Sequence, residues 1–116
     1  MTEPEYELVP RGDAPNDAAM SLCISDDCMQ PYISSGERVY VSVGTPPEEF
    51  GVGVFMYEGR VLCRQWCESY SGALMLLAAN PARQSENVII PPSRRDKLVC
   101  LGRVITDKPL PRPSYV

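Results

Sequence analysis

Proline and glycine divide this chain into short segments, and this division constrains the fold more than any other feature of the sequence. The chain contains 12 prolines and 8 glycines in 116 residues. Several of them form turn signals, such as Ser34-Ser35-Gly36, Glu58-Gly59 and Asn80-Pro81. The segments between these turns are short, and none shows a sustained helical period. Many short strands separated by turn signals are typical of a mainly β domain.

The clearest predicted strands have a two-residue period, in which apolar and polar side chains alternate. The Glu58-Gly59 pair predicts a two-residue hairpin turn, because glycine adopts a positive φ without a Cβ clash. Gly102 predicts a bulge in the last strand. One short helical turn is predicted over residues 28–32, after the first strand. The predicted strands cover residues 20–25, 38–43, 52–57, 60–66, 73–79, 88–90 and 97–105.

Prolines also mark the ends of the predicted domain, which occupies residues 20–108. Pro4, Pro10 and Pro15 interrupt residues 1–19, which predicts an irregular leader. Residues 109–116 contain three prolines and predict an extended tail. Hydrophobic residues make up 44% of the chain, enough for one modest core.

Charge and hydropathy argue against two classes of partner. The net charge is −4 and the pI is about 4.8, so the chain has no basic stripe for DNA phosphates. We therefore expect no direct binding of nucleic acid. No apolar run approaches the roughly 18 residues needed to cross a bilayer, and the acidic N-terminal residues do not resemble a secretory signal. We expect a cytoplasmic protein without membrane association.

Five cysteines and no histidine limit the available chemistry. An odd number of cysteines in a cytoplasmic chain argues against a disulfide framework. Without histidine, neither a Cys–His nor a Ser–His–Asp arrangement can form within the chain. A zinc site would need Cys23 or Cys28 to join Cys63 and Cys67, which do not form a C-x-x-C pair. Small buried apolar side chains are the simpler interpretation, and we expect no metal and no cofactor.

The segment around Cys28 carries the most specific motif. Residues 24–41 read I-S-D-D-C-M-Q-P-Y-I-S-S-G-E-R-V-Y-V. This run resembles the nucleophile motif of the self-cleaving LexA and phage-repressor family, V-x-G-D-S-M-x-P-x-I-x-x-G-D-x-V-x-V. The family's nucleophilic serine falls on Cys28, and its glycine two residues earlier falls on Asp26. The matching positions are Asp27, Met29, Pro31, Ile33, Gly36, Val39 and Val41.

Three further segments resemble the family in the same order. Residues 59–66, G-R-V-L-C-R-Q-W, resemble a strand of the form G-E-L-Y-V-K-R-L, whose lysine is the general base. That lysine falls on Arg64, or on Cys63 if the register slips by one. Residues 74–81 resemble the family's L-x-L-x-S-x-N-P turn, and residues 101–105 resemble its closing I-x-G-x-V strand. The resemblance extends over residues 20–106.

The resemblance implies a folded β-sheet domain like that of LexA and the signal peptidases, with one short helical turn after the first core strand. In that family a serine attacks a peptide bond of the protein's own linker, and a buried neutral lysine accepts the proton. Arginine stays protonated in proteins and cannot act as this base. The resemblance therefore implies a degenerate site, with Cys28 and Arg64 at the catalytic positions and a cleft formed by Asp26, Asp27, Met29 and Pro31.

Arg64 also carries a structural expectation, because a partly buried arginine usually has a carboxylate or carbonyl partner. Asp26 and Asp27 are the nearest candidates. A second interpretation gives Cys28 a chemistry of its own, since a nearby guanidinium favours the strongly nucleophilic thiolate. The chain would then be a cysteine-nucleophile self-cleaving peptidase or a thiol-reactive sensor.

The resemblance implies a function in assembly as well. The family uses this domain to form dimers, which bring two DNA-binding domains onto a palindromic operator in repressors of the SOS response and of phages. We expect a homodimer whose contact surface includes residues 98–105 and the proline-rich tail. The chain would be a dimerisation or interaction module of a transcriptional or phage-type repressor. DNA binding would belong to a separate domain of a longer parent protein.

Overall fold

The structure is a computed structural model that describes residues 6–8, by their backbone alone, together with residues 20–106 and residue 110. It is mainly β, as the sequence predicts. Eight strands form one antiparallel sheet in the order β1-β2-β3-β8-β4-β5-β6-β7. The strands are β1 (Tyr6–Leu8), β2 (Met20–Cys23), β3 (Arg38–Val43), β4 (Val52–Tyr57), β5 (Arg60–Glu68), β6 (Leu74–Leu77), β7 (Val88–Ile90) and β8 (Val99–Ile105).

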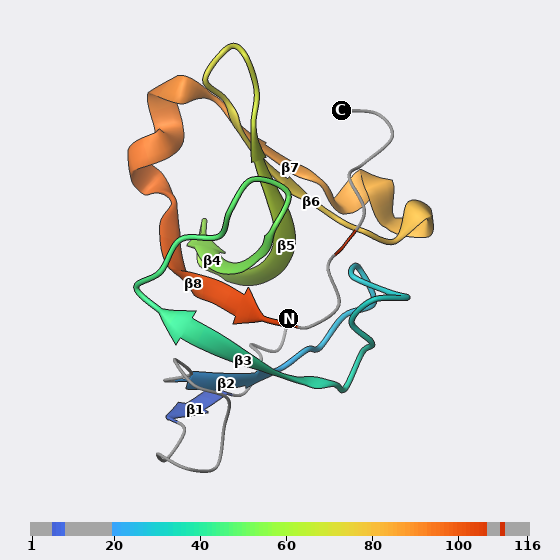
Figure 1. The fold of residues 1–116 in the computed structure, drawn as a ribbon. Coiled ribbons are helices and arrows are strands. Elements are labelled where there is room, and N and C mark those ends of the chain that lie inside the picture. The colour runs from blue at the N-terminus through green and yellow to red at the C-terminus, as the bar shows by residue number, and fades with distance from the viewer. Residues whose placement is uncertain (1–5, 9–19, 107–109, 111–116) are drawn as a thin grey trace.

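The last strand occupies the middle of this sheet. Strands β1 to β3 pair in chain order, and so do β4 to β7, while β8 lies between β3 and β4. Figure 1 shows β1, β2 and β3 at one end of the molecule and β6 and β7 at the other, with the curled β4–β5 hairpin between them. The middle of the sheet is therefore occupied by a strand that is distant in sequence from both of its neighbours.

The predicted hairpin turn joins β4 to β5. Tyr57 pairs with Arg60, which leaves Glu58 and Gly59 as a two-residue loop. Their φ angles are 50° and 74°, and a positive φ at both central positions is the signature of a type I′ turn. The prediction of a hairpin at this position is confirmed.

The predicted bulge lies next to Gly102. Val54 pairs with Gly102 but Phe55 pairs with Cys100, so β8 has one extra residue, Leu101, opposite β4. Gly102 also lies against β3, where a Cβ atom would come within 2.3 Å of the carbonyl oxygen of Ser42. The position therefore requires glycine because of close backbone approach as well as the bulge.

Several elements differ from the sequence-based expectations. The leader is not wholly irregular, since Tyr6–Leu8 forms strand β1 and pairs with β2; its remaining residues lie outside the described part of the chain. The predicted helical turn is a series of hydrogen-bonded turns, including the bond from Ile33 N–H to the Met29 carbonyl at 2.9 Å. The structure also contains two 3₁₀ helices that the sequence analysis did not predict, η1 (Pro81–Glu86) and η2 (Pro92–Lys97).

Both short helices have a local sequence signal that an analysis of strand patterns does not detect. Each begins with a proline at its first position, where the missing N–H costs no hydrogen bond. Neither helix contains a buried residue, so neither leaves an apolar period in the sequence. The tail predicted over residues 109–116 lies outside the described residues except for Leu110, which packs against the core.

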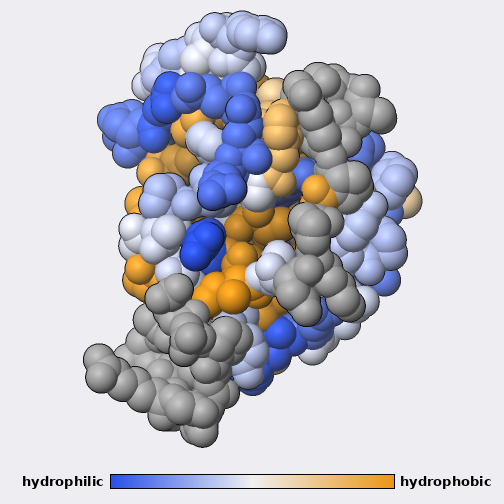
Figure 2. Space-filling view, in the orientation of Figure 1, coloured by the Kyte–Doolittle hydropathy of each residue, from blue (hydrophilic) through white to orange (hydrophobic). Residues whose placement is uncertain are grey.

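The core forms two clusters that share β4 and β5. The side chains of β4 point to opposite faces of the sheet and enter different clusters. Val52 and Val54 belong to one cluster, while Phe55 and Tyr57 belong to the other. The larger cluster also contains residues from β2, β3 and β8 and the turn around Met29. Figure 2 shows hydrophobic residues in the centre of one face, bordered by hydrophilic ones.

Replacing Gly102 with alanine should destabilise the domain by about 2–4 kcal/mol, because the new Cβ would overlap backbone of β3 that cannot move aside. Urea denaturation followed by circular dichroism measures this loss. Cys100→Ala, an exposed position on the same strand, is the matched control and should change stability by less than about 0.5 kcal/mol. Equal effects of the two substitutions would show that the close approach is absent.

Candidate functional site

Cys28 lies in the turn that follows β2, and hydrogen bonds hold its backbone on both sides. Its N–H donates to Oδ1 of Asp26 at 3.1 Å, which closes a local side-chain turn. Its carbonyl accepts from the Asn80 N–H at 2.9 Å, and the Asn80 amide group donates to the Asp27 carbonyl at 2.9 Å. The thiol itself is buried, with 3% of the residue exposed. The turn is thus fixed against the segment that precedes η1.

Arg64 lies on β5 and is almost completely buried, with 1% exposure. Its Nη1 donates to the Cys63 carbonyl at 2.8 Å and lies 3.5 Å from Oδ2 of Asp26. Its Nε is buried and has no hydrogen-bond partner among the described residues. The expectation of a carboxylate or carbonyl partner is therefore confirmed, and of the two candidate carboxylates it is Asp26 that approaches the guanidinium.

The neighbouring carboxylate has a different partner. Asp27 accepts two hydrogen bonds from Arg83, from Nε at 2.8 Å and from Nη2 at 3.2 Å. This side-chain hydrogen bonding lowers the pKa of Asp27 below its usual value. Both side chains of this pair are exposed by more than a third, so the pair contributes little to stability. Asp26 and Asp27 thus each face a separate arginine.

In the structure, the two residues at the predicted catalytic positions, Cys28 and Arg64, both contact the carboxylate of Asp26. Asp26 contacts the backbone of Cys28 and the guanidinium of Arg64 at the same time. The other two predicted cleft residues lie elsewhere in the turn: Met29 is fully buried in the larger core cluster and Pro31 is exposed. The candidate site therefore consists of Asp26, Cys28 and Arg64.

Burial governs the thiol chemistry at this site. Burial raises the pKa of Cys28 above its usual value, and the positive charge of Arg64 opposes this rise only in part. Burial likewise raises the pKa of Cys63, next to Arg64 on β5, to about 12. A raised pKa leaves little thiolate at neutral pH, and the thiolate is the nucleophilic form. We therefore expect both thiols to be poor nucleophiles in the folded domain.

Asn80 and Arg83 are the site residues that the sequence analysis missed. They hold the Cys28 turn from η1, across 50 or more residues of sequence. Asn80 also caps η1, since its Oδ1 accepts from the Ala82 N–H at 3.0 Å. In the sequence, the Asn80-Pro81 pair predicts a turn. An asparagine directly before a proline is also a helix-start signal, and it could have predicted the cap but not the long-range contact.

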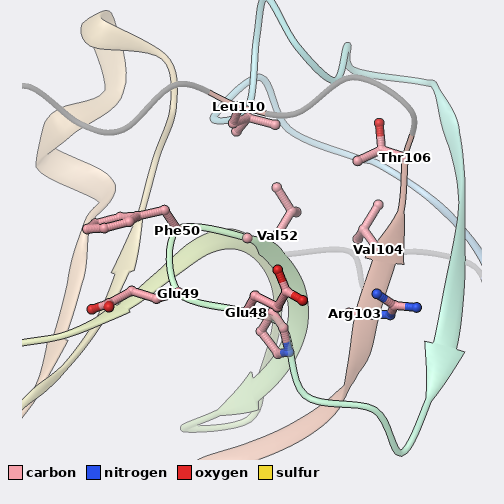
Figure 3. Close-up of a pocket in the computed structure, with 10 residues that line it drawn as sticks. Glu48, Glu49, Phe50, Val52, Arg103, Val104, Thr106 and Leu110 are labelled. Atoms are coloured by element: carbon pink, nitrogen blue, oxygen red, sulfur yellow. The ribbon is translucent and has the colours of Figure 1, made fainter.

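A cavity of about 290 Å³ lies between the β3–β4 loop and the end of β8 (Figure 3). The loop is held in place at Phe50, which has a φ of 65° and whose N–H donates to the Trp66 carbonyl at 2.7 Å. The charged residues that line the cavity are Glu48, Glu49 and Arg103. They have both signs, so the cavity does not favour one class of charged ligand.

Metal and membrane signals are absent from the described part of the chain. Within it, no three histidine, cysteine, aspartate or glutamate side chains gather in a group that could hold a metal ion. Cys63 and Cys67 lie four residues apart on one strand, a separation of about 13 Å. None of the helices in these residues has the length and hydropathy to cross a bilayer.

In comparisons with known proteins, no family model matches the chain, and no curated protein shows significant similarity to it.

Alkylation should distinguish Cys28 from the exposed thiol. With iodoacetamide at pH 7.5 we expect Cys100 to react first and Cys28 to stay protected, because Cys100 is exposed whereas Cys28 is buried. Peptide mapping by mass spectrometry measures each rate, and the same reaction in urea should remove the difference. Preferential labelling of Cys28 in the folded protein would instead identify a reactive thiol.

Proposed function

We propose that the chain is a catalytically degenerate LexA-like domain that serves as a dimerisation or interaction module of a transcriptional or phage-type repressor. The observation that supports this best is the meeting of Cys28 and Arg64 at Asp26. These residues occupy the serine, lysine and glycine positions of the family motif. DNA binding would belong to a separate domain of a longer parent protein.

Three properties of the site argue against peptide-bond cleavage. Arg64 cannot accept a proton from a nucleophile, because a guanidinium remains charged in proteins. The Cys28 thiol has a raised pKa and is buried. The Cys28 N–H, which in an acyl-transfer site would help to stabilise a developing oxyanion, is already bound to the Asp26 carboxylate. The three groups that peptide-bond cleavage needs are the general base, the nucleophile and the oxyanion donor. Each of them is thus unsuited to its role here.

The alternative function is a cysteine-nucleophile self-cleaving peptidase or a thiol-reactive sensor. The positive charge of Arg64 favours it, because that charge lowers the pKa of Cys28. Burial has the larger and opposite effect on the same thiol. The balance therefore favours the degenerate domain over the reactive thiol.

An apolar surface on β4 and β8 supports the proposed interaction. Met56 is 41% exposed and Val99 is 51% exposed, and the two are register partners on adjacent strands. Large apolar side chains grouped on a surface are a common feature of protein–protein contacts. This surface overlaps the closing strand on which the dimer contact is expected.

Self-association tests the proposed interaction. Sedimentation velocity should show a monomer–dimer equilibrium that depends on concentration. The double substitution Met56→Lys and Val99→Lys should raise the dimer dissociation constant at least about tenfold, because a two-fold interface would contain each new charge twice. Ile89→Lys, at an exposed apolar position on the edge strand β7, is the control and should leave association unchanged. A monomer at every concentration would contradict the proposal.

Rebuilding the family residues tests the degenerate site. Incubated at pH 10 with a supplied peptide containing an Ala-Gly bond, the natural domain should leave the peptide uncut. Cys28→Ser with Arg64→Lys should cleave it slowly, and adding Asp26→Gly should raise the rate at least about tenfold, because it frees the oxyanion donor. Mass spectrometry of the products measures each rate.

Two outcomes would contradict this account. Cleavage by the natural domain that disappears in Cys28→Ala would show that the thiol is catalytic. Equal rates for the double and triple variants would show that Asp26 does not block the site.

A further inference from the structure

Asp26 connects two groups that each attract an anion. Its Oδ1 accepts from the Cys28 N–H at 3.1 Å, and its Oδ2 lies 3.5 Å from Nη1 of Arg64. A backbone N–H and a guanidinium are donors that proteins commonly use to bind carboxylates. We propose that the Cys28 amide and the Arg64 guanidinium form a binding site for a small carboxylate, and that Asp26 occupies this site from within the chain.

The burial of Arg64 explains why the site requires an anion. A buried charge without a partner is strongly unfavourable, and Arg64 is 1% exposed. Among the described residues its ion-pair partner is Asp26, at the long distance of 3.5 Å. Its other hydrogen bond goes to the neutral carbonyl of Cys63, and its Nε is buried without a partner. Nη1 is therefore the guanidinium nitrogen at which Asp26, or a carboxylate in its place, supplies the counter-charge.

Asp26 can leave the site because it lies at the surface. Its side chain is 44% exposed, whereas that of Arg64 is buried. The hollow that borders Asp26 measures only about 10 Å³, room for about one water molecule, and neither Cys28 nor Arg64 lines it. A ligand therefore enters only when Asp26 turns outward or is removed. The space it vacates suits a small carboxylate such as formate or acetate.

Asp26 is also an incomplete ligand for Arg64. Its two oxygens are divided between the amide and the guanidinium, so it does not form the two parallel bonds of a bidentate arginine–carboxylate pair. A free carboxylate is not tied to the backbone and can approach Nη1 of Arg64 and the Cys28 amide more closely than Asp26 does. The inference rests on these donors alone and does not depend on the proposed function.

The neighbouring acid supplies a matched control. Asp27 is adjacent in sequence, carries the same charge and is held by Arg83 at the surface. Glu86 is near enough to raise the pKa of Cys28 through its charge. Removing Asp27 therefore changes the local charge by the same amount as removing Asp26 but leaves the contact between Asp26 and Arg64 in place.

Thermal unfolding of the full chain tests the site. In sodium chloride, Asp26→Ala should unfold at a lower temperature than the natural protein. Replacing chloride with sodium acetate at equal ionic strength should raise its Tm saturably, by roughly 4 °C when acetate is at about five times its Kd. The natural protein and Asp27→Ala should show no such rise, and neutral acetamide should not replace acetate. The Cys28 amide resonance should shift during the acetate titration of Asp26→Ala alone.

An equal acetate effect on all three proteins, or no effect on Asp26→Ala, would overturn the proposal. Should Asp26→Ala be unfolded in chloride, the readout becomes recovery of the folded signal in acetate. Asp26→Asn, which keeps an acceptor for the Cys28 amide but removes the charge, is measured in the same way. Failure of acetate to stabilise either variant also overturns the site.

Discussion

Strand β8 is the constraint on which the rest of the sheet depends, because it alone joins the two halves of the described sheet. It pairs with β3 on one side and with β4 on the other. The Cys28 turn follows β2 in one half, and Arg64 lies on β5 in the other. Their meeting at Asp26 therefore requires β8 to be in place, with its bulge at Leu101 and the close backbone approach at Gly102.

At this meeting point the domain keeps a permanent charge inside its core. A buried lysine can release its proton and become neutral, whereas a buried arginine stays charged and needs an anion. Asp26 supplies that anion through its contact with Nη1. Asp26 and Arg64 are thus physically linked, because either one alone would leave a charge in or beside the core without its partner.

Signals between neighbouring residues predicted much of the fold, whereas contacts between residues distant in sequence were not predicted. Period-2 alternation, the Glu58-Gly59 turn and Gly102 are read from neighbouring residues, and they predicted the main strands, the hairpin and the bulge. The η1 helix has no buried face, so it leaves no apolar period in the sequence, and only the Asn80-Pro81 pair signals its start. A sequence also does not say which of two adjacent aspartates will face a buried arginine. That choice depends on Asn80 and Arg83, which hold the turn from more than 50 residues away and direct Asp27 outward.

The Asp26–Arg64 pair also accounts for the state of the Cys28 thiol. A guanidinium alone would stabilise a thiolate, but here the charge of Asp26 raises the pKa of Cys28 while the charge of Arg64 lowers it. The charge of Asp26 opposes that of Arg64, and burial has the largest effect, so the pKa of the thiol is raised. A neutral, buried thiol behaves as a small apolar side chain. Reactivity at Cys28 and the internal ion pair are therefore opposed: any change that removes Asp26 without supplying another carboxylate leaves Arg64 free to stabilise the thiolate.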